Sequence, residues 1–154
     1  FANMHDPYPM INGRGYPDTV LAADAMSKPV QNLHDKIVQG ENALVEATVG
    51  QKILLRVSSL STTDFFSIKA LGLDMKVIGM GAKQLRTASG VPNPYMTNTI
   101  TLGGGEAIDV IIDTAGVTPG KYFLYTSNLN HLSNDKQDFG GMMTEIVITA
   151  AGGA

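Results

Sequence analysis

The sequence predicts an all-β domain folded as an antiparallel sandwich or barrel. Most of the chain consists of short runs rich in Val, Ile, Leu and Phe, separated by turn signals that contain Gly or Pro. No segment shows the periodicity of a long amphipathic helix. A length of 154 residues suits one domain, and a hydrophobic content of 44% is enough to build a buried core.

Eight runs carry the β pattern from residue 43 onward. Residues 107–113 (AIDVIID) are strongly β-branched, and residues 64–71 alternate, which places Phe66, Ile68 and Ala70 on one side. We therefore expect seven to eight strands. The runs are residues 43–49, 52–58, 64–71, 75–80, 97–102, 107–113, 121–127 and 143–150.

The chain divides into three parts by composition. Residues 1–40 hold four prolines and few strand-like runs, so we expect an extended lead-in that packs on the domain or links to it. Within the lead-in, residues 19–26 fit either a weak strand or a short helix. Residues 41–150 form the predicted domain, and residues 151–154 are a small, flexible tail.

Composition excludes several classes of function. Net charge is −3 and there is no basic stripe, which argues against a nucleic-acid partner. No apolar run reaches the roughly 18 residues of a membrane span. There is no cysteine, which excludes disulfides, thiolate zinc sites, iron–sulfur clusters and cysteine nucleophiles. No secretory signal is visible, so we expect a mature protein, a processed one or a fragment.

Two groups of side chains are candidate metal ligands. His131 with Met142 and Met143 could bind a soft ion such as Cu(I), although core packing is the commoner role of methionine. His5 and His34 could each contribute to a metal shared with a neighbouring domain, although a lone histidine is more often a surface residue.

The acidic loop near the carboxyl end is a weaker calcium candidate. Asn134, Asp135 and Asp138 lack the alternating oxygen ligands and the final Glu of a calcium loop, so a solvated loop explains them better. Gly103-Gly104-Gly105 is not a phosphate loop, because no Gly-Lys-Ser/Thr follows it and the next run is a strand.

Five motifs occur in an order that resembles the cupredoxin domains of multicopper oxidases. The order matches that of the central domain of these proteins, which holds no blue copper. The motifs cover residues 8–149, nearly the whole chain. They are residues 8–14 (YPMINGR), 49–57 (VGQKILLRV), 66–80, 100–113 (ITLGGGEAIDVIID) and 120–125.

The resemblance implies a Greek-key cupredoxin sandwich of two sheets. It also implies an exported protein, which is periplasmic, at the cell surface or extracellular. The family couples oxidation of a substrate to reduction of oxygen, and copper carries that chemistry. Other cupredoxin domains or identical chains are the implied partners, and copper is the implied cofactor of the parent protein.

The same resemblance places this chain's residues at the positions of copper ligands. Thr126 falls where a blue-copper domain has its cysteine, Tyr125 and Ser127 replace the flanking histidines, and Leu73 replaces the upstream histidine. Blue copper needs a thiolate and two imidazoles. A trinuclear cluster needs eight histidines in His-x-His pairs, whereas this chain has three histidines and no such pair. We therefore predict no cofactor and no catalytic residue within this chain.

Three hypotheses for the function remain open. The first is a copper-free cupredoxin domain with a structural, interdomain role in a multicopper-oxidase-like oxidoreductase. The second is a self-assembling or partner-binding sandwich that exchanges residues 1–40 with a neighbour. The third is an oxidase with copper bound between chains, which would require His5, His34 and His131 to meet at an interface.

Overall fold

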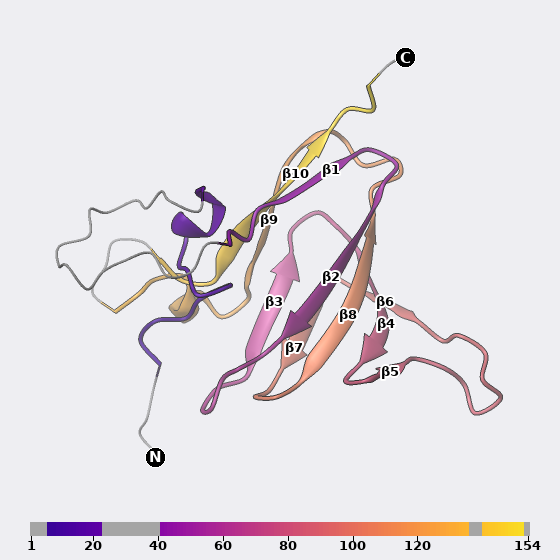
Figure 1. The fold of residues 1–154 in the computed structure, drawn as a ribbon, viewed down its shortest axis with the longest axis horizontal. Helices are drawn as coiled ribbons and strands as arrows, with labels where there is room; N and C mark the ends of the chain where they lie inside the picture. Colours follow the sequence, from indigo (N-terminus) through magenta and orange to yellow (C-terminus); the bar gives the residue numbers. More distant parts are fainter. Residues whose placement is uncertain (1–5, 23–40, 136–139, 153–154) are drawn as a thin grey trace.

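The computed structural model describes residues 6–22, 41–135 and 140–152. Two β-sheets pack face to face, which confirms the all-β sandwich (Figure 1). The first sheet has the strand order β1-β10-β9-β3-β7, and the second has the order β2-β8-β4-β5, with β6 paired to β4. Two short 3-10 helices, η1 (Asp18–Val20) and η2 (Leu129–His131), lie outside the sheets.

The described residues form ten strands. The strands are β1 (Val45–Thr48), β2 (Lys52–Ser58), β3 (Phe66–Ala70), β4 (Met75–Met80), β5 (Lys83–Gln84), β6 (Tyr95–Thr97), β7 (Thr99–Leu102), β8 (Ala107–Asp113), β9 (Gly120–Thr126) and β10 (Met143–Thr149).

Among the described strands one neighbouring pair is parallel, and it consists of the first and the last strand in the sequence. β1 pairs in parallel with β10, with Val45 opposite Ile146. All other pairs are antiparallel, including β9 with β10, β3 with β9 and β2 with β8. The β4–β8 register shifts between Val77 and Gly79, an irregularity that bends this strand.

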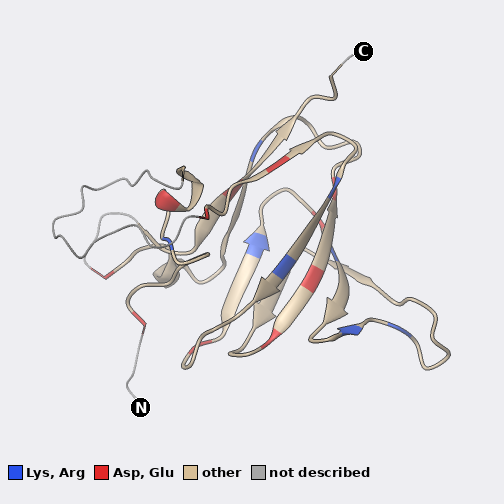
Figure 2. Ribbon diagram, in the orientation of Figure 1, with Lys and Arg blue, Asp and Glu red and all other residues tan. Residues whose placement is uncertain are grey.

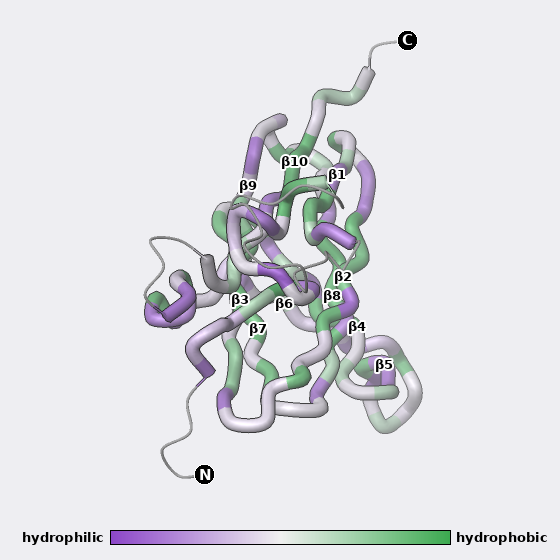
Figure 3. The backbone as a smooth tube through the Cα atoms, turned by 60° about the vertical axis from the view of Figure 1, so that its left-hand side comes forward, coloured by the Kyte–Doolittle hydropathy of each residue, from purple (hydrophilic) through white to green (hydrophobic). Residues whose placement is uncertain are grey.

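The core lies between the inner faces of the two sheets. On β8, Ile108, Val110 and Ile112 are buried, while the residues between them are half-buried or exposed. On β10, Ile146 and Ile148 face them from the first sheet. Figure 3 shows hydrophobic stretches running along the strands and hydrophilic ones at the turns. The alternation follows from the two-residue period of a strand with one face buried.

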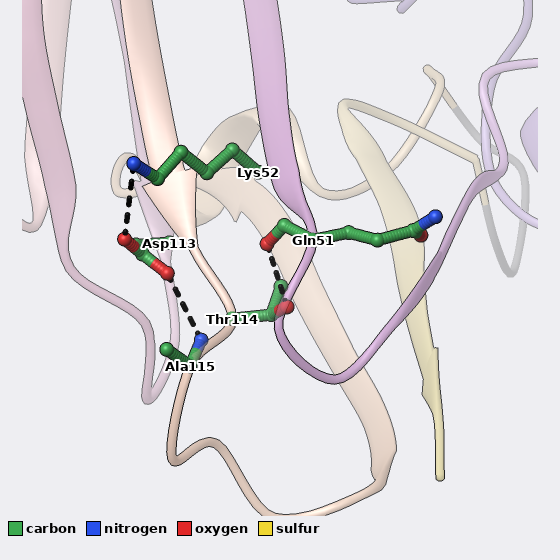
Figure 4. Close-up of polar contacts among 5 residues, drawn as sticks. All are labelled: Gln51, Lys52, Asp113, Thr114 and Ala115. Atoms are coloured by element: carbon green, nitrogen blue, oxygen red, sulfur yellow. Dashed lines mark hydrogen bonds and ion pairs between the residues drawn. The ribbon is translucent and has the colours of Figure 1, made fainter. Parts of the chain in front are cut away.

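The turn between β1 and β2 carries the chain from the first sheet into the second, as do the later connections from β3 to β4 and from β7 to β8. β1 belongs to the first sheet and β2 to the second, and Gly50-Gln51 joins them, with Gly50 at a φ of +92°. The fully buried hydroxyl of Thr114 donates to the carbonyl oxygen of Gln51 at 2.7 Å or that of Thr48 at 3.0 Å (Figure 4). Beside it, Lys52 forms a 3.8 Å ion pair with Asp113.

The eight predicted β runs all contain strands, with ends displaced by two residues or fewer. Two short strands, β5 and β6, were not predicted, because two or three residues are too few to show alternation. In residues 19–26 the described part contains η1, and residues 23–26 lie outside the described residues. The division into 1–40, 41–150 and 151–154 stays a prediction. No helix in the described part of the chain is long and apolar enough to cross a membrane.

The buried Thr114 hydroxyl gives a test of this crossing. Thr114→Val keeps the shape but removes the hydroxyl donor, while both carbonyl oxygens keep a backbone donor, so we expect a loss of about 1 kcal/mol in the free energy of unfolding. Urea unfolding would measure the loss. Thr118→Val, at an exposed position of the next turn, should change it by less than about 0.5 kcal/mol. Equal effects of the two substitutions would contradict this role of Thr114.

Candidate functional site

The described residues of the candidate metal site lie in the segment between β9 and β10 and at the first residue of β10. The backbone of this segment ties the candidate residues together through two hydrogen bonds. Thr126 donates its N–H to the carbonyl oxygen of Met142 at 2.9 Å, and Met142 donates its own to that of His131 at 2.9 Å. The residues that the sequence singled out therefore lie close to one another in the folded chain.

Thr126 ends β9 and is fully buried. Its hydroxyl oxygen accepts the N–H of Asn128 at 3.2 Å and lies 3.4 Å from the carbonyl oxygen of the same residue. Both contacts are local bonds of the kind that Thr forms at the end of a strand. This hydroxyl is therefore engaged in a turn at the position where the resemblance expects a thiolate.

His131 ends the helix η2, which Asn128 caps. Its ring meets Phe66 edge-on, with ring centroids 5.0 Å apart. The Asn128 Oδ1 accepts from the N–H of Asn130 at 3.2 Å, so its Nδ2 is the atom that faces His131 Nε2 at 3.5 Å. This orientation assigns the imidazole proton to Nδ1, which is buried and has no hydrogen-bond partner among the described residues.

The two methionines differ in their surroundings. Met142 is 4% exposed and belongs to the hydrophobic core, whereas Met143 is half-buried and pairs with Tyr125 across β9 and β10. Leu73, at the position of the upstream ligand, is also a core residue at 4% exposed. Two of the positions from which copper ligands would come, Leu73 and Met142, are therefore packed among apolar side chains.

The remaining candidates that the structure describes do not form a metal site with this segment. Among the described residues, no group of three or more His, Asp or Glu side chains lies close enough to share a metal ion. His5, His34 and Asp138 lie outside the described residues. Asn134 is buried and its Oδ1 accepts the N–H of Gly141 at 3.0 Å, so it stabilises the loop locally.

A blue-copper centre does not fit the donor set at this place. Its positions hold Leu73, Tyr125, Thr126, Ser127 and His131, which supply one imidazole and no thiolate. The only imidazole directs a buried N–H inward, and its Nε2 faces an amide donor. A soft ion at His131 would need a lone pair on Nδ1 or the displacement of Asn128.

A second polar cluster attaches the lead-in to the outer side of β10. The Tyr16 hydroxyl donates to Glu145 Oε1 at 2.9 Å, and Lys121 Nζ lies 2.7 Å from Oε2 of the same carboxylate. The Glu145 side chain is 7% exposed, against 55% for that of Lys121. Burial and the bond to Glu145 raise the pKa of Tyr16, and the bond to Glu145 raises the pKa of Lys121.

Further bonds hold the same lead-in segment in place. The fully buried Thr19 donates its hydroxyl to the carbonyl oxygen of Met143 at 2.7 Å. Arg14, 5% exposed, donates from Nη1 toward the carbonyl oxygens of Asp18 and Leu21, both at 3.1 Å. We did not single out these residues from the sequence. The available signal was Glu145, a carboxylate inside the otherwise apolar strand MTEIVIT.

A groove of about 900 Å³ opens between the sheets at the edge formed by β2. One wall is β2, from Leu54 to Ser58, and the facing wall comes from the inner side of the first sheet with Ile68 and Leu124. Residues 6–13 of the lead-in line its mouth. No sequence motif indicated this groove, because it results from where one sheet ends.

Comparison with known proteins identifies a family model and solved structures of the same fold. Residues 4–149 match the family model described as multicopper oxidase. A blue copper oxidase from Nitrosomonas europaea is 23% identical with a TM-score of 0.52, over 68% of this chain and 30% of that one. The multicopper oxidase mgLAC is 22% identical with a TM-score of 0.53, over 71% and 31%.

A multicopper oxidase from Pseudomonas thermotolerans is 19% identical with a TM-score of 0.53, over 68% of this chain and 22% of that one. The chain thus spans less than a third of the length of each of these structures. At these identities the likeness concerns the fold. A search of curated proteins finds no match.

Gly141 gives a test of the loop that leads into β10. Its φ is +81°, and a Cβ there would meet the carbonyl oxygen of His131, whereas Gly116 has a similar φ of +76° and open space. We expect Gly116→Ala to cost about 1–2 kcal/mol from backbone strain alone. Gly141→Ala should cost at least about 1 kcal/mol more, because a backbone contact is added. Thermal or urea unfolding of both variants would measure this, and equal losses would contradict the close approach.

The Glu145 cluster predicts a loss of stability in alkaline solution. Both folded pKa values are raised, so the stabilisation is complete below the ordinary values of 10.0 for Tyr16 and 10.5 for Lys121. It is lost as the pH rises through the raised values. Urea unfolding at a series of pH values above 8 should show a steeper fall for the native sequence than for Glu145→Gln. Glu46→Gln, at an exposed carboxylate on β1, should follow the native curve.

Proposed function

From the premise that this chain belongs to the multicopper oxidase family, we propose that it is a copper-free cupredoxin domain with a structural role. The family match covers residues 4–149, and the two-sheet fold agrees with it. In this proposal the domain spaces and orients copper-bearing domains of a larger oxidoreductase. The parent protein, by the same reasoning, contains copper and is exported.

One observation carries the copper-free part of the proposal. Thr126 stands where the resemblance places the cysteine, and its buried hydroxyl is bonded to the backbone of Asn128. A hydroxyl engaged in this way is a poor substitute for a thiolate, and the chain has no cysteine to supply one. The copper-free part of the proposal thus rests on donor chemistry: a hydroxyl oxygen stands where a thiolate sulfur is needed.

The core packing of the former ligand positions supports a structural role. Leu73 and Met142 join the apolar core that holds the two sheets together. Leu73 replaces an imidazole with an apolar side chain that can only pack, so this position contributes to the sandwich and not to a ligand set. In this proposal, these positions contribute apolar packing between the sheets and do not bind an ion.

The other two hypotheses concern residues that the structure describes only in part. Exchange of residues 1–40 between chains would have to break the bonds of Thr19 to Met143 and of Tyr16 to Glu145 and reform them with a neighbour. Copper between chains would involve His5 and His34, which lie outside the described residues. Neither hypothesis has an observation that favours it over the structural role.

Copper loading of the purified chain tests the proposal. After incubation with Cu(II) and desalting, we expect no intense blue colour and less than about one copper per chain by metal analysis. The variant His131→Ala is the matched control, because it removes the single imidazole of the segment. One firmly held copper that gives the blue colour, and that is lost in His131→Ala, would overturn the copper-free role.

A further inference from the structure

We propose that the free edge of β2 accepts an extended strand from a neighbouring protein domain, which completes the second sheet and fills the groove beside it. The inference concerns the open edge of β2 and does not depend on whether the domain binds copper, although Met142 lines the inner end of the same groove. Copper loading decides the proposed function, whereas the experiment below decides this one.

The hydrogen-bonding phase of β2 shows which backbone groups face the open edge. In an antiparallel pair, residues bonded to the partner strand alternate with residues whose N–H and C=O point away from it. The N–H of Thr114 donates to the carbonyl oxygen of Gln51, and that of Ser59 donates to the carbonyl oxygen of Glu106, so the odd-numbered residues of β2 bond to β8. The N–H and C=O groups of Leu54 and Arg56 therefore point to the edge.

No described segment occupies that edge. β2 is the terminal strand of its sheet and pairs only with β8. Residues 6–13 line the groove, but among the described residues no backbone hydrogen bond joins them to β2. Unpaired strand edges are templates for the addition of another strand.

The side chains beside the edge form an incomplete core. The inward side chains of β2 become more exposed along the strand, from Ile53 at 8% exposed to half-buried Leu55 and Val57. Ile68 and Leu124 of the first sheet line the opposite wall of the groove. Leu60, at 91% exposed, lies on the rim. Alternate apolar side chains of an added strand would fill this volume of about 900 Å³.

Charge indicates which strand fits. Arg56 is exposed, lines the groove and forms no ion pair with another described residue, and Lys52, which pairs with Asp113, lies four residues before it on the same face. Figure 2 shows these basic positions on β2 beside acidic positions on β8. A strand added on the open side meets the basic residues, so a carboxylate on its outer face is favoured.

The same charges disfavour a second copy of this chain. Two β2 strands paired antiparallel about Leu54 would place Lys52 opposite Arg56, and pairing about Arg56 would place two arginines together. Pairing about Leu55 opposes no like charges, but it gives Arg56 only Leu54 as its partner, whereas an acidic strand gives it a carboxylate. Like charges directly opposite each other destabilise a strand pair. We therefore assign the edge to a different domain, whose strand alternates apolar residues with polar ones that include Asp or Glu.

Residue-resolved hydrogen exchange with a synthetic peptide tests the assignment. The probe is a nine-residue peptide that alternates Val or Leu with Thr or Asp, and its scrambled sequence is the control peptide. In the free chain we expect the amides of Leu54 and Arg56 to exchange fast and that of Leu55 to exchange slowly. The alternating peptide should slow Leu54 and Arg56 by at least about tenfold, and the scrambled peptide should not.

Two substitutions at one position separate backbone pairing from charge. Arg56→Pro removes an N–H that β8 does not use, so the fold should survive while peptide affinity falls by about tenfold or more. Arg56→Ala keeps the N–H and should lose only a few-fold. If Arg56→Pro fails to fold, Arg56→Glu serves instead: it should reverse the preference toward a peptide with Lys in place of Asp.

Other outcomes would overturn the assignment. Binding of the peptide without protection of Leu54 and Arg56 would place it elsewhere, and absence of binding would leave the edge without this partner. Protection of these amides without peptide, in a dimer detected by light scattering, would assign the edge to a second copy. The same protection in a monomer would mean that residues 6–13 already cover it.

Discussion

The crossing at Gly50-Gln51 is the constraint from which the arrangement of the sheets follows. Because β1 lies in the first sheet and β2 in the second, this turn holds the end of β1 close to the start of β2, and so joins the two sheets at that point. The buried Thr114 hydroxyl holds the turn against the end of β8. The bond from Thr114 N–H to Gln51 also sets the phase of the β2–β8 ladder, and that phase leaves the Leu54 and Arg56 backbone groups unpaired.

The segment before β10 shows how a family's fold can remain when a ligand set is absent. The positions that the resemblance gives to copper ligands hold side chains that either pack apolar surface or form local turn bonds. Met142 and Leu73 pack apolar surface, and Thr126 forms local turn bonds. A sandwich of this kind gains its stability mainly from burial between its two sheets.

Strands and turns could be predicted from the sequence because their signals are local. Alternation in residues 64–71 and β-branching in 107–113 both reflect a pleated surface with one buried face. The Glu145 cluster could not be predicted in the same way. Its members Tyr16, Lys121 and Glu145 come from distant parts of the chain and meet only after the lead-in packs on the sheet. The groove at β2 is likewise a property of where a sheet ends, which no residue pattern encodes.

The parallel pairing of β1 with β10 has a consequence for the order in which the domain is made. Val45 and Ile146 lie opposite each other, although nearly all of the domain's sequence separates them. During synthesis the first sheet therefore stays open along β10 until the last strand leaves the ribosome, and closing so long a loop is slow. Until then the edges of β9 and β1 that pair with β10 remain unpaired, and unpaired strand edges favour aggregation.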